Sequence, residues 1–544
     1  MSLIGAILRH AHSHPDRGAL VCPLVSPAVH FSYAELTGRV RRAAGGLAQA
    51  GLKPGHRAMI VMNRPEQALP IMLACLYLGV TSSILAESNA GSSGNTGEKN
   101  RINPARENDF HALISNDSAA SGIVPVLDAG ELMSSRPISA SPFAWDPEQI
   151  VYIQFSSGTS GRRKGVMISH RALTRLLEDF PQTHGKRDHC TFASWLPLYH
   201  DFGLFAGALR PLYSGCRALL ATPFQWLRSP ARFVGALRDH QAAVWFITPS
   251  GLTHTLRCLP RDTEDLRKTA LEGIILGGEP VQGPLLAYLR ESLRSLGCAP
   301  TILRNGYGMA ENTLYACITP MGEGIKQIGG SHPQGNPRAK IYVSIGKPHG
   351  SNEIRICDDL NREREEGEIG EIQIRSRSLF SGYYRRPDLE PTLTPDGWYP
   401  TKDLGFRLGD TIFFSGRKTD MIISGGENIA PEDIEALTYG IEGIIPERSA
   451  AFGIYERSLG TERIALMVES IRGLAKKQHD DIVRKLARRI HAETGQAAGT
   501  IRVVPRGWVC RTRNGKISRS RTREKFLATR IGPISGDPDP PGIM

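Results

Sequence analysis

The sequence predicts an α/β protein with a large N-terminal domain of layered α/β subdomains plus a β-rich subdomain, followed by a small α+β C-terminal domain. The chain has 544 residues, which is more than one hydrophobic core usually holds. Helical and strand-like segments alternate through its first half, as is typical of layers around a largely parallel sheet. Short strands and turns replace this alternation after residue 345. We therefore expect domains at residues 1–416 and 417–530, and a disordered tail at residues 531–544.

The N-terminal segments carry start and stop signals for helices. Ser32 is expected to begin an amphipathic helix that ends at Gly51, and Pro54 follows as a breaker. Residues 86–109 are rich in Ser, Gly and Asn, a composition typical of a mobile loop. The expected helices are residues 3–11, 36–50 and 65–79, and the expected strands are residues 58–62, 80–85, 110–114 and 122–127.

Three strands in the middle of the chain end at Gly-rich or Pro-rich turns. These turns are residues 249–251, 277–280 and 306–311. Ligands of open α/β sheets bind beyond the carboxyl ends of the strands, so the turns are candidate site segments. The expected strands here are residues 152–155, 191–194, 243–248, 271–276 and 301–305, and the expected helices are residues 170–179, 232–241 and 284–296.

The C-terminal part predicts a β-rich subdomain and then a small α+β domain. Residues 413–420 are the candidate boundary between them. The expected strands are residues 353–357, 368–375, 449–453 and 463–468, and the expected helices are residues 431–439 and 476–494.

A loop of small polar residues follows the strand at residues 152–155. Residues 156–161 contain only Ser, Thr and Gly, so backbone and hydroxyl donors can surround an anion, and Lys164 adds a cation. The pattern predicts a triphosphate-binding loop. It is not a Walker A loop, because Gly165 rather than Ser or Thr follows the lysine. The alternative is a flexible loop that binds nothing.

The composition restricts compartment and partners. Nine cysteines without a CxxC pair favour a reducing compartment, so we expect a cytoplasmic protein without structural disulfides. The N-terminus has no basic region before its apolar residues, so we expect no secretory signal, and the longest apolar run, residues 71–80, is too short to span a bilayer. The net charge is +12, and residues 501–530 hold eight Arg and two Lys against one Glu. This basic stretch is either a solvated face or a docking surface for an acidic partner.

Five stretches in fixed order carry a family resemblance: the phosphate loop and residues 307–311, 397–405, 416–428 and 514–516. Together they resemble the adenylate-forming superfamily, which comprises acyl-CoA synthetases, nonribosomal adenylation domains and fatty acyl-AMP ligases. Residues 195–215, 278–281 and 307–314 are similar to the fatty acyl-AMP ligase branch. The resemblance covers residues 1–528 and implies ATP and Mg²⁺ as cofactors and a mobile C-terminal domain.

The resemblance also implies roles for individual residues. The loop would bind the β- and γ-phosphates of ATP, and Glu311 would hold Mg²⁺. Asp403 and Arg417 would bind the ribose, and Lys516 would reach the α-phosphate and the acyl oxygen. His200 would line or gate the acyl tunnel. The expected catalytic residues are Lys516, Lys164 and His200, and the expected nucleotide-binding residues are Ser156, Ser157, Gly158, Thr159, Ser160, Gly161, Gly278, Glu279, Pro280, Tyr307, Gly308, Met309, Asp403 and Arg417.

Each role has a plainer alternative. Glu311 could be a surface carboxylate, Tyr307 a core residue and Lys516 one more cation in a basic segment. His200 and Asp201 would face opposite ways if they lay in a strand. Two residues depart from the family pattern: Lys402 stands where glycine is usual, and Thr419 stands at the hinge where Asp or Lys is common.

The overall prediction is an ATP-dependent acyl-AMP ligase that loads a carboxylic acid, expected to be fatty, onto an acyl carrier protein. We expect an arginine cluster to dock the acidic carrier, comprising Arg511, Arg513, Arg519, Arg521 and Arg523. The first alternative is an acyl- or aryl-CoA ligase, because the segment at residues 318–344, where related ligases carry an insertion that hinders CoA turnover, is short. The second is a non-enzymatic nucleic-acid binder, although no RNA-binding or helix-turn-helix motif accompanies the basic stretch, and we expect no nucleic-acid partner.

Overall fold

The chain divides into two compact units, Met1–Ser415 (the large unit) and Gly416–Met544 (the small unit). A computed structural model describes the chain in these ranges: 1–87, 109–116, 124–155, 164–180, 190–260, 266–331, 339–389, 393–424, 427–456, 459, 461–512 and 516–529. The phosphate loop, most of the loop expected at residues 86–109 and the tail expected at residues 531–544 lie outside these ranges.

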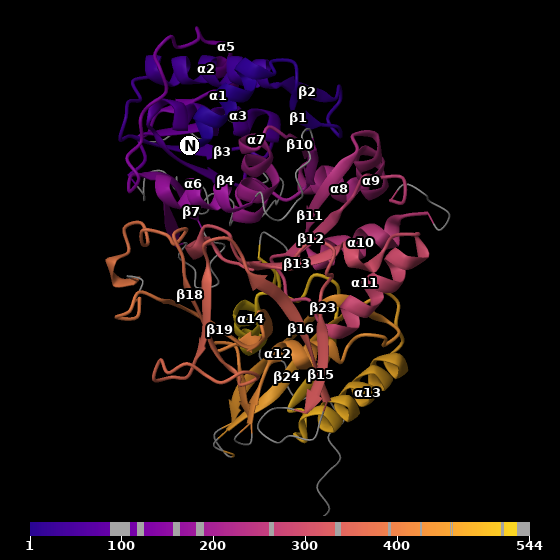
Figure 1. The fold of residues 1–544 in the computed structure, drawn as a ribbon. Helices are drawn as coiled ribbons and strands as arrows, with labels where there is room; N and C mark the ends of the chain where they lie inside the picture. Colours follow the sequence, from indigo (N-terminus) through magenta and orange to yellow (C-terminus); the bar gives the residue numbers. More distant parts are fainter. Residues whose placement is uncertain are drawn as a thin grey trace, which may run out of the picture. The chain divides into compact units, whose positions relative to one another are not determined.

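A six-stranded sheet begins the large unit, with strand order β6-β5-β3-β4-β7-β8. Its strands are parallel except β8, which returns antiparallel to β7. The strands are β3 Arg57–Val61, β4 Thr81–Leu85, β5 Ala112–Ser115, β6 Val126–Leu127, β7 Ile150–Phe155 and β8 Gly165–Ser169. The helices of this part are α1 Leu3–Ser13, α2 Tyr33–Gln49, α3 Pro65–Leu78, α5 Ala129–Ser134 and α6 His170–Asp179, of which α2, α3 and α5 lie together (Figure 1).

Local signals explain where these helices begin and end. Ser32 and Glu35 form a reciprocal capping box at the start of α2, as the sequence predicted for Ser32. Gly79 ends α3 in the left-handed conformation that favours glycine. The alternation predicted from the sequence is therefore confirmed in this part of the large unit.

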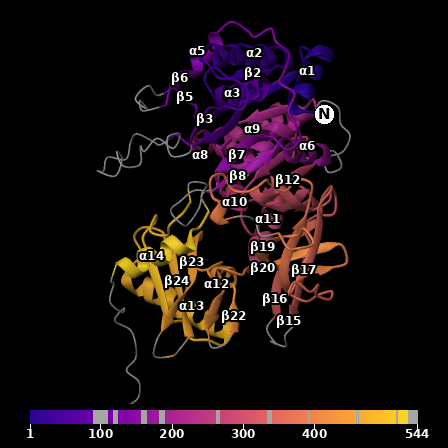
Figure 2. The same cartoon turned by 90° about the vertical axis from the view of Figure 1, so that its left-hand side faces the viewer.

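A 14-stranded sheet forms the rest of the large unit, with β15 paired to β16 off the main path. The strands β1, β10, β9, β11, β12 and β13 pair in parallel, and β14 begins an antiparallel portion. In Figure 2, β16, β17, β19 and β20 lie side by side in that β-rich portion. The strands are β1 Gly18–Cys22, β2 Val29–Ser32, β9 Thr191–Ser194, β10 Arg217–Leu220, β11 Ala242–Ile247, β12 Gly273–Gly277, β13 Leu303–Gly308, β14 Tyr315–Ile318, β15 Gln327–Ser331, β16 Ala339–Pro348, β17 Glu353–Cys357, β18 Gly370–Arg375, β19 Tyr399–Leu408 and β20 Thr411–Arg417.

Several helices of this second part, including α10, Pro249–Cys258, were not predicted from the sequence. A π-helix, Phe202–Leu209, follows β9 and runs directly into α7, Arg210–Tyr213. Residues 249–251, expected to be a turn, form the first turn of α10, because Thr248 caps it and Pro249 favours the first helical position. The other helices are α8 Pro223–Arg228, α9 Pro230–Asp239, α10 Pro249–Cys258 and α11 Gly283–Ser295.

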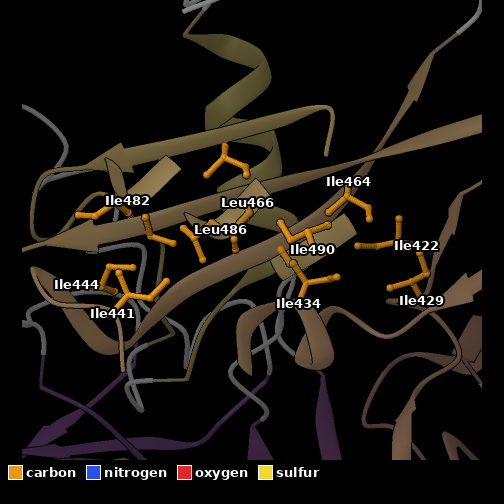
Figure 3. Close-up of a cluster of buried hydrophobic side chains, with 13 residues drawn as sticks. Ile422, Ile429, Ile434, Ile441, Ile444, Ile464, Leu466, Ile482, Leu486 and Ile490 are labelled. Atoms are coloured by element: carbon orange, nitrogen blue, oxygen red, sulfur yellow. The ribbon is translucent and has the colours of Figure 1, made fainter. Parts of the chain in front are cut away.

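The small unit packs helix α13 against a three-stranded sheet. Ile482, Leu486 and Ile490 recur at helical spacing along α13 and enter one buried cluster with Ile464 and Leu466 of β24 (Figure 3). Helix α13 spans the predicted residues 476–494. The elements are β21 Ile422–Ser424, β22 Glu427–Ile429, α12 Pro431–Ala436, β23 Ile444–Glu456, β24 Thr461–Ser470, α13 Lys476–Thr494, β25 Thr500–Val504 and α14 Arg519–Ala528. Among the described residues, no helix combines the length and apolar content that crossing a bilayer requires.

Candidate active site

Four side chains from separate segments are connected through Tyr383. The hydroxyl of Tyr383 donates a 2.8 Å hydrogen bond to Oε1 of Glu311, and the hydroxyls of Tyr383 and Tyr399 lie 3.5 Å apart. The Nζ atom of Lys164 lies 5.3 Å from the centre of the Tyr383 ring, within the range of a cation–π contact. We call Lys164, Glu311, Tyr383 and Tyr399 the Glu311 cluster. It brings a cation to the ring and a carboxylate to the hydroxyl of one tyrosine.

Backbone pairing explains why Lys164 reaches this tyrosine. Residues 381–384 run beside β8, where the N–H of Tyr384 donates to the carbonyl of Gly165 and the N–H of Met167 donates to the carbonyl of Gly382. Lys164 immediately precedes β8, so the same pairing places its side chain on the Tyr383 ring. The predicted phosphate-loop lysine and the predicted metal-binding carboxylate therefore converge on Tyr383.

Both tyrosines of the cluster are held as hydrogen-bond donors. Burial raises the pKa of Tyr383, and the negative charge of Glu311 raises it further. Burial, followed by Glu311, also raises the pKa of Tyr399. Because the phenolate form is disfavoured at both positions, both hydroxyls keep their protons near neutral pH, and Tyr383 donates its proton to the carboxylate.

A strained turn fixes the backbone next to Glu311. Thr313 has φ 59° and ψ −47°, and the N–H of Leu314 donates to the carbonyl of Asn312 over 2.6 Å, which closes a γ-turn. This conformation is rare for a β-branched residue and costs on the order of 1–3 kcal/mol. The Thr313 hydroxyl donates to the carbonyl of Ser378 at 2.6 Å and holds the turn in place. A strained backbone conformation that surrounding contacts hold in place is typical of functional sites.

Tyr307 and Asp403 form a second polar pair, between β13 and β19. The Tyr307 hydroxyl donates to Oδ2 of Asp403 at 2.8 Å, and Asp403 is only 3% exposed. Burial and the Asp403 charge raise the pKa of Tyr307, so it stays a donor. Lys402 adopts φ 64° in the left-handed region, which explains why glycine is usual at this position. The two residues expected to frame the adenine and bind the ribose are therefore in direct contact.

Two glycines of the expected nucleotide site are required by geometry. A Cβ atom on Gly308 would lie 1.7 Å from the carbonyl oxygen of Leu314. Gly278 has φ 82° and immediately follows β12. The next residue, Glu279, accepts hydrogen bonds from the N–H of Ser250 at 3.1 Å and from its hydroxyl at 2.9 Å. Glu279 thus stabilises the N-terminus of α10, where a negative charge is favourable.

The expectation that His200 and Asp201 face opposite ways is wrong. They lie in the turn that begins the π-helix, with Nδ1 of His200 2.5 Å from Oδ1 of Asp201. The side chain of Asp201 also accepts the N–H of Phe202 at 2.7 Å. The apolar run after them folds as a helix instead of a strand, which brings the two side chains together.

The small unit carries Lys516 and Arg417. The carbonyl of Lys516 accepts the N–H of Thr512 at 2.7 Å, and Arg511 and Ile517 form a bridge beside it, so this pairing fixes the backbone at Lys516. Residues 513–515 lie outside the described ranges. Arg417 ends β20, and its carbonyl accepts the N–H of Asp420.

One member of the expected carrier-docking cluster is not available on the surface. Arg519 forms two hydrogen bonds with Glu435, at 2.8 and 2.7 Å, and contacts Glu432 and Asp420 at 2.8 and 3.1 Å. Glu432 and Glu435 are buried, so this arginine neutralises charges inside the small unit. The expectation that Arg519 docks a partner is therefore wrong, whereas Arg521 and Arg523 are exposed.

Two residues of the Glu311 cluster were not predicted as site residues. Tyr399 lies within the motif at residues 397–405, which was a signal that could have identified it. Tyr383 lies in Gly-Tyr-Tyr, residues 382–384, which has no distinctive pattern. Residues Ser156 to Gly161 lie outside the described ranges, and within those ranges no group of three His, Cys, Asp or Glu side chains is arranged to hold a metal ion.

The fold and these strand-end residues define the architecture of adenylate-forming enzymes. A structure from a study of fatty acyl-adenylate ligases of E. coli and L. pneumophila matches with a TM-score of 0.86 at 23% identity and covers 97% of this chain and 98% of that one. The chain belongs to the AMP-binding enzyme family, whose model matches residues 7–384. It is accordingly an acid-activating, AMP-forming ligase.

Curated relatives share nearly three quarters of the chain. A protein named putative fatty-acid–CoA ligase FadD21, of Mycobacterium tuberculosis, is 30% identical over 425 residues, which cover 72% of each chain. A protein named probable long-chain-fatty-acid–AMP ligase FadD30, of the same species, is 28% identical over 424 residues, which cover 71% of this chain and 72% of that one.

Proposed function

We propose that this protein uses ATP to convert a fatty acid to its acyl-adenylate and then passes the acyl group to the phosphopantetheine thiol of an acyl carrier protein. The observation that carries the proposal is that Lys164 lies over the ring of Tyr383 while Glu311 accepts a hydrogen bond from its hydroxyl. It places the residue after the predicted phosphate loop beside the residue expected to hold Mg²⁺. Membership of the AMP-binding enzyme family supports the use of ATP.

In the first step, a carboxylate oxygen of the acid attacks the α-phosphorus of ATP. The bond from this phosphorus to the β-phosphate oxygen breaks, and pyrophosphate leaves. Both reactants are anions, so cations must hold them in line and offset the charge that develops. We assign this task to Lys164 and Lys516, with residues Ser156 to Gly161 supplying N–H and hydroxyl donors.

The nucleoside is assigned to the Tyr307–Asp403 pair. A carboxylate can accept several hydrogen bonds, so Asp403 can take the ribose hydroxyls while it holds Tyr307. Gly278, Glu279, Pro280, Gly308 and Met309 would border the base. Arg417 would add a contact to the ribose.

Glu311 fits a magnesium ion by its chemistry. Mg²⁺ prefers oxygen ligands and usually takes one or two carboxylates together with phosphate oxygens, so a single glutamate beside a triphosphate suffices. When bound, the ion would neutralise charge on the leaving pyrophosphate. Tyr383 would orient the carboxylate for that purpose, as hydrogen bonds to ligating carboxylates usually do.

In the second step, the thiol sulfur attacks the acyl carbonyl carbon, the bond to the AMP oxygen breaks, and the thiol proton is lost. A long-chain acid and a carrier acceptor are supported by the relative named as a long-chain-fatty-acid–AMP ligase and by a structural neighbour that joins an adenylation domain to a peptidyl carrier protein, at TM-score 0.83 and 20% identity. The alternative acceptor is CoA, which the relative named as a fatty-acid–CoA ligase favours.

Two measurements test the proposal in sequence. ATP–pyrophosphate exchange across carboxylic acids of increasing chain length should select fatty acids, and exchange with short or aromatic acids alone would contradict the assigned substrate. Preformed acyl-adenylate is then offered CoA or a phosphopantetheinylated carrier protein. Faster thioester formation on the carrier supports the proposal, and faster formation of acyl-CoA establishes the CoA ligase instead.

A further inference from the structure

Two cysteines meet at the amino ends of neighbouring strands in the large unit. Cys190 immediately precedes β9 and Cys216 immediately precedes β10, and the two strands pair in parallel with Thr191 opposite Arg217. The N–H of Arg217 donates to the carbonyl of Cys190, which extends the pairing to the cysteines themselves. Their sulfur atoms lie 2.7 Å apart. Adjacent strand positions are about 5 Å apart, within the Cα separation that a disulfide spans.

A buried cation lies beside this pair. Arg210 is 3% exposed, and its Nε and Nη1 atoms have no hydrogen-bond partner among the described residues. Its guanidinium lies 5.2 Å from the centre of the Phe180 ring and interacts electrostatically with both thiols. Burial lowers the pKa of Arg210 to about 10, so it remains charged at neutral pH. A buried guanidinium without a carboxylate partner favours a negative charge nearby.

The cysteine pair can supply that charge. The hydrogen bond from Cys190 lowers the pKa of the Cys216 thiol, and the Arg210 charge lowers it further. A thiolate beside a cation is the reactive form of cysteine, and a neighbouring thiol can resolve its oxidation product. Cys190 is partly exposed, whereas Cys216 is buried.

We propose that Cys190 and Cys216 are a peroxide-sensitive dithiol that closes to a disulfide, with Arg210 as its activating cation. The charged sulfur of the pair attacks one oxygen of hydrogen peroxide, so an S–O bond forms, the O–O bond breaks and one water leaves after taking up a proton. The other thiol then attacks this sulfur, so the S–S bond forms, the S–O bond breaks and a second water leaves. Two thiols are oxidised and one peroxide is reduced to two waters.

The site is separate from the chemistry of ATP. It lies at the amino ends of β9 and β10, whereas His200 follows the carboxyl end of β9. We therefore expect Cys190→Ser and Cys216→Ser to retain ATP–pyrophosphate exchange, which serves as the test that each variant is folded.

The sequence allows a direct test on the full chain. Trypsin does not cleave before Pro211, so both cysteines fall in one peptide, residues 188–217. The reduced protein is treated with hydrogen peroxide, quenched with catalase, denatured, alkylated with iodoacetamide and digested. The proposal predicts that this peptide becomes two hydrogen atoms lighter, takes up no iodoacetamide and recovers both alkylation sites after dithiothreitol.

Variants distinguish a specific disulfide between Cys190 and Cys216 from unspecific oxidation of exposed cysteines. Cys258→Ser, which removes an exposed cysteine, should leave the product unchanged, whereas Cys190→Ser and Cys216→Ser should abolish it. Arg210→Met should slow its formation roughly tenfold if the thiol pKa rises by about one unit. The proposal is overturned if residues 188–217 stay fully alkylated at a peroxide dose that oxidises Cys258, or if Cys190 and Cys216 pair equally with other cysteines.

Discussion

The hydroxyl of Tyr383 donates a hydrogen bond to the Glu311 carboxylate while the Tyr383 ring carries Lys164 on its face. Substitution of Tyr383 by Phe keeps the ring and removes only the hydrogen bond. A hydrogen bond to a charged group contributes about 1.5–3 kcal/mol, so kcat/KM for adenylation should fall roughly tenfold to a hundredfold. The Mg²⁺ concentration that gives half-maximal ATP–pyrophosphate exchange should rise as well.

Tyr399→Phe is the matched control for this variant. Its hydroxyl lies 3.5 Å from that of Tyr383 and, among the contacts of the described residues, makes no hydrogen bond to the carboxylate, so the loss should be smaller. Equal losses in the two variants, with an unchanged Mg²⁺ requirement, would show that Tyr383 does not orient Glu311.

Arg519 is predicted to stabilise the small unit. Arg519→Met leaves Glu432 and Glu435 buried without their cation, and the loss of one partner from a buried ion pair costs about 3–5 kcal/mol. Hydrogen exchange of peptides from β23 and β24 should therefore accelerate. Arg521→Met, an exposed position in the same helix, should change stability by less than about 0.5 kcal/mol. Similar exchange in the two variants would contradict a structural role for Arg519.

Gly308 is predicted to tolerate no side chain. The Cβ atom of Gly308→Ala would meet the Leu314 carbonyl oxygen at 1.7 Å, and backbone must move to relieve this contact. Urea unfolding should show a loss of about 3 kcal/mol or more. Gly235→Ala is the matched control, because this helical glycine has open space around its Cβ position and should gain about 1 kcal/mol. A stable, active Gly308→Ala variant would refute the geometry of this hairpin.

His349 makes the stability depend on pH. Burial lowers the pKa of His349 to about 4, and an unfolded histidine has a pKa near 6.5. The unfolded chain therefore binds more protons between these values, so the free energy of unfolding falls as the pH falls from 6.5 to 4, by about 3 kcal/mol from this residue. In His349→Gln, the free energy of unfolding measured with urea should depend less on pH between 4 and 6.5. His12→Gln, at an exposed position, should leave this pH dependence unchanged. An unchanged pH dependence in His349→Gln would show that another residue causes it.

Local signals predicted much of the fold. The capping residue Ser32 and the helix at residues 476–494 are visible in the sequence because caps and helical periodicity involve neighbours only a few positions apart. The π-helix Phe202–Leu209 was missed because it is buried on all sides, and an apolar run without periodicity does not distinguish a helix from a strand.

The contacts that build the site join residues far apart in sequence. Glu311 and Tyr383 are separated by 72 positions, and Tyr307 and Asp403 by 96. Motif order indicated that Glu311, Tyr307 and Asp403 belong to one site, but no spacing rule reveals which side chains touch. The same holds for Arg519, which looked like a surface cation until the fold placed Glu435, 84 positions away, beside it.

ATP–pyrophosphate exchange by Lys516→Ala, with a fatty acid present, tests the central claim most directly. The account predicts that exchange falls by a factor on the order of 10² or more, since the variant lacks a cation that offsets charge developing on the reacting phosphate. Lys525→Ala, which removes another lysine of the small unit, should retain most of the exchange. Full-speed exchange in Lys516→Ala would contradict the assigned adenylation site.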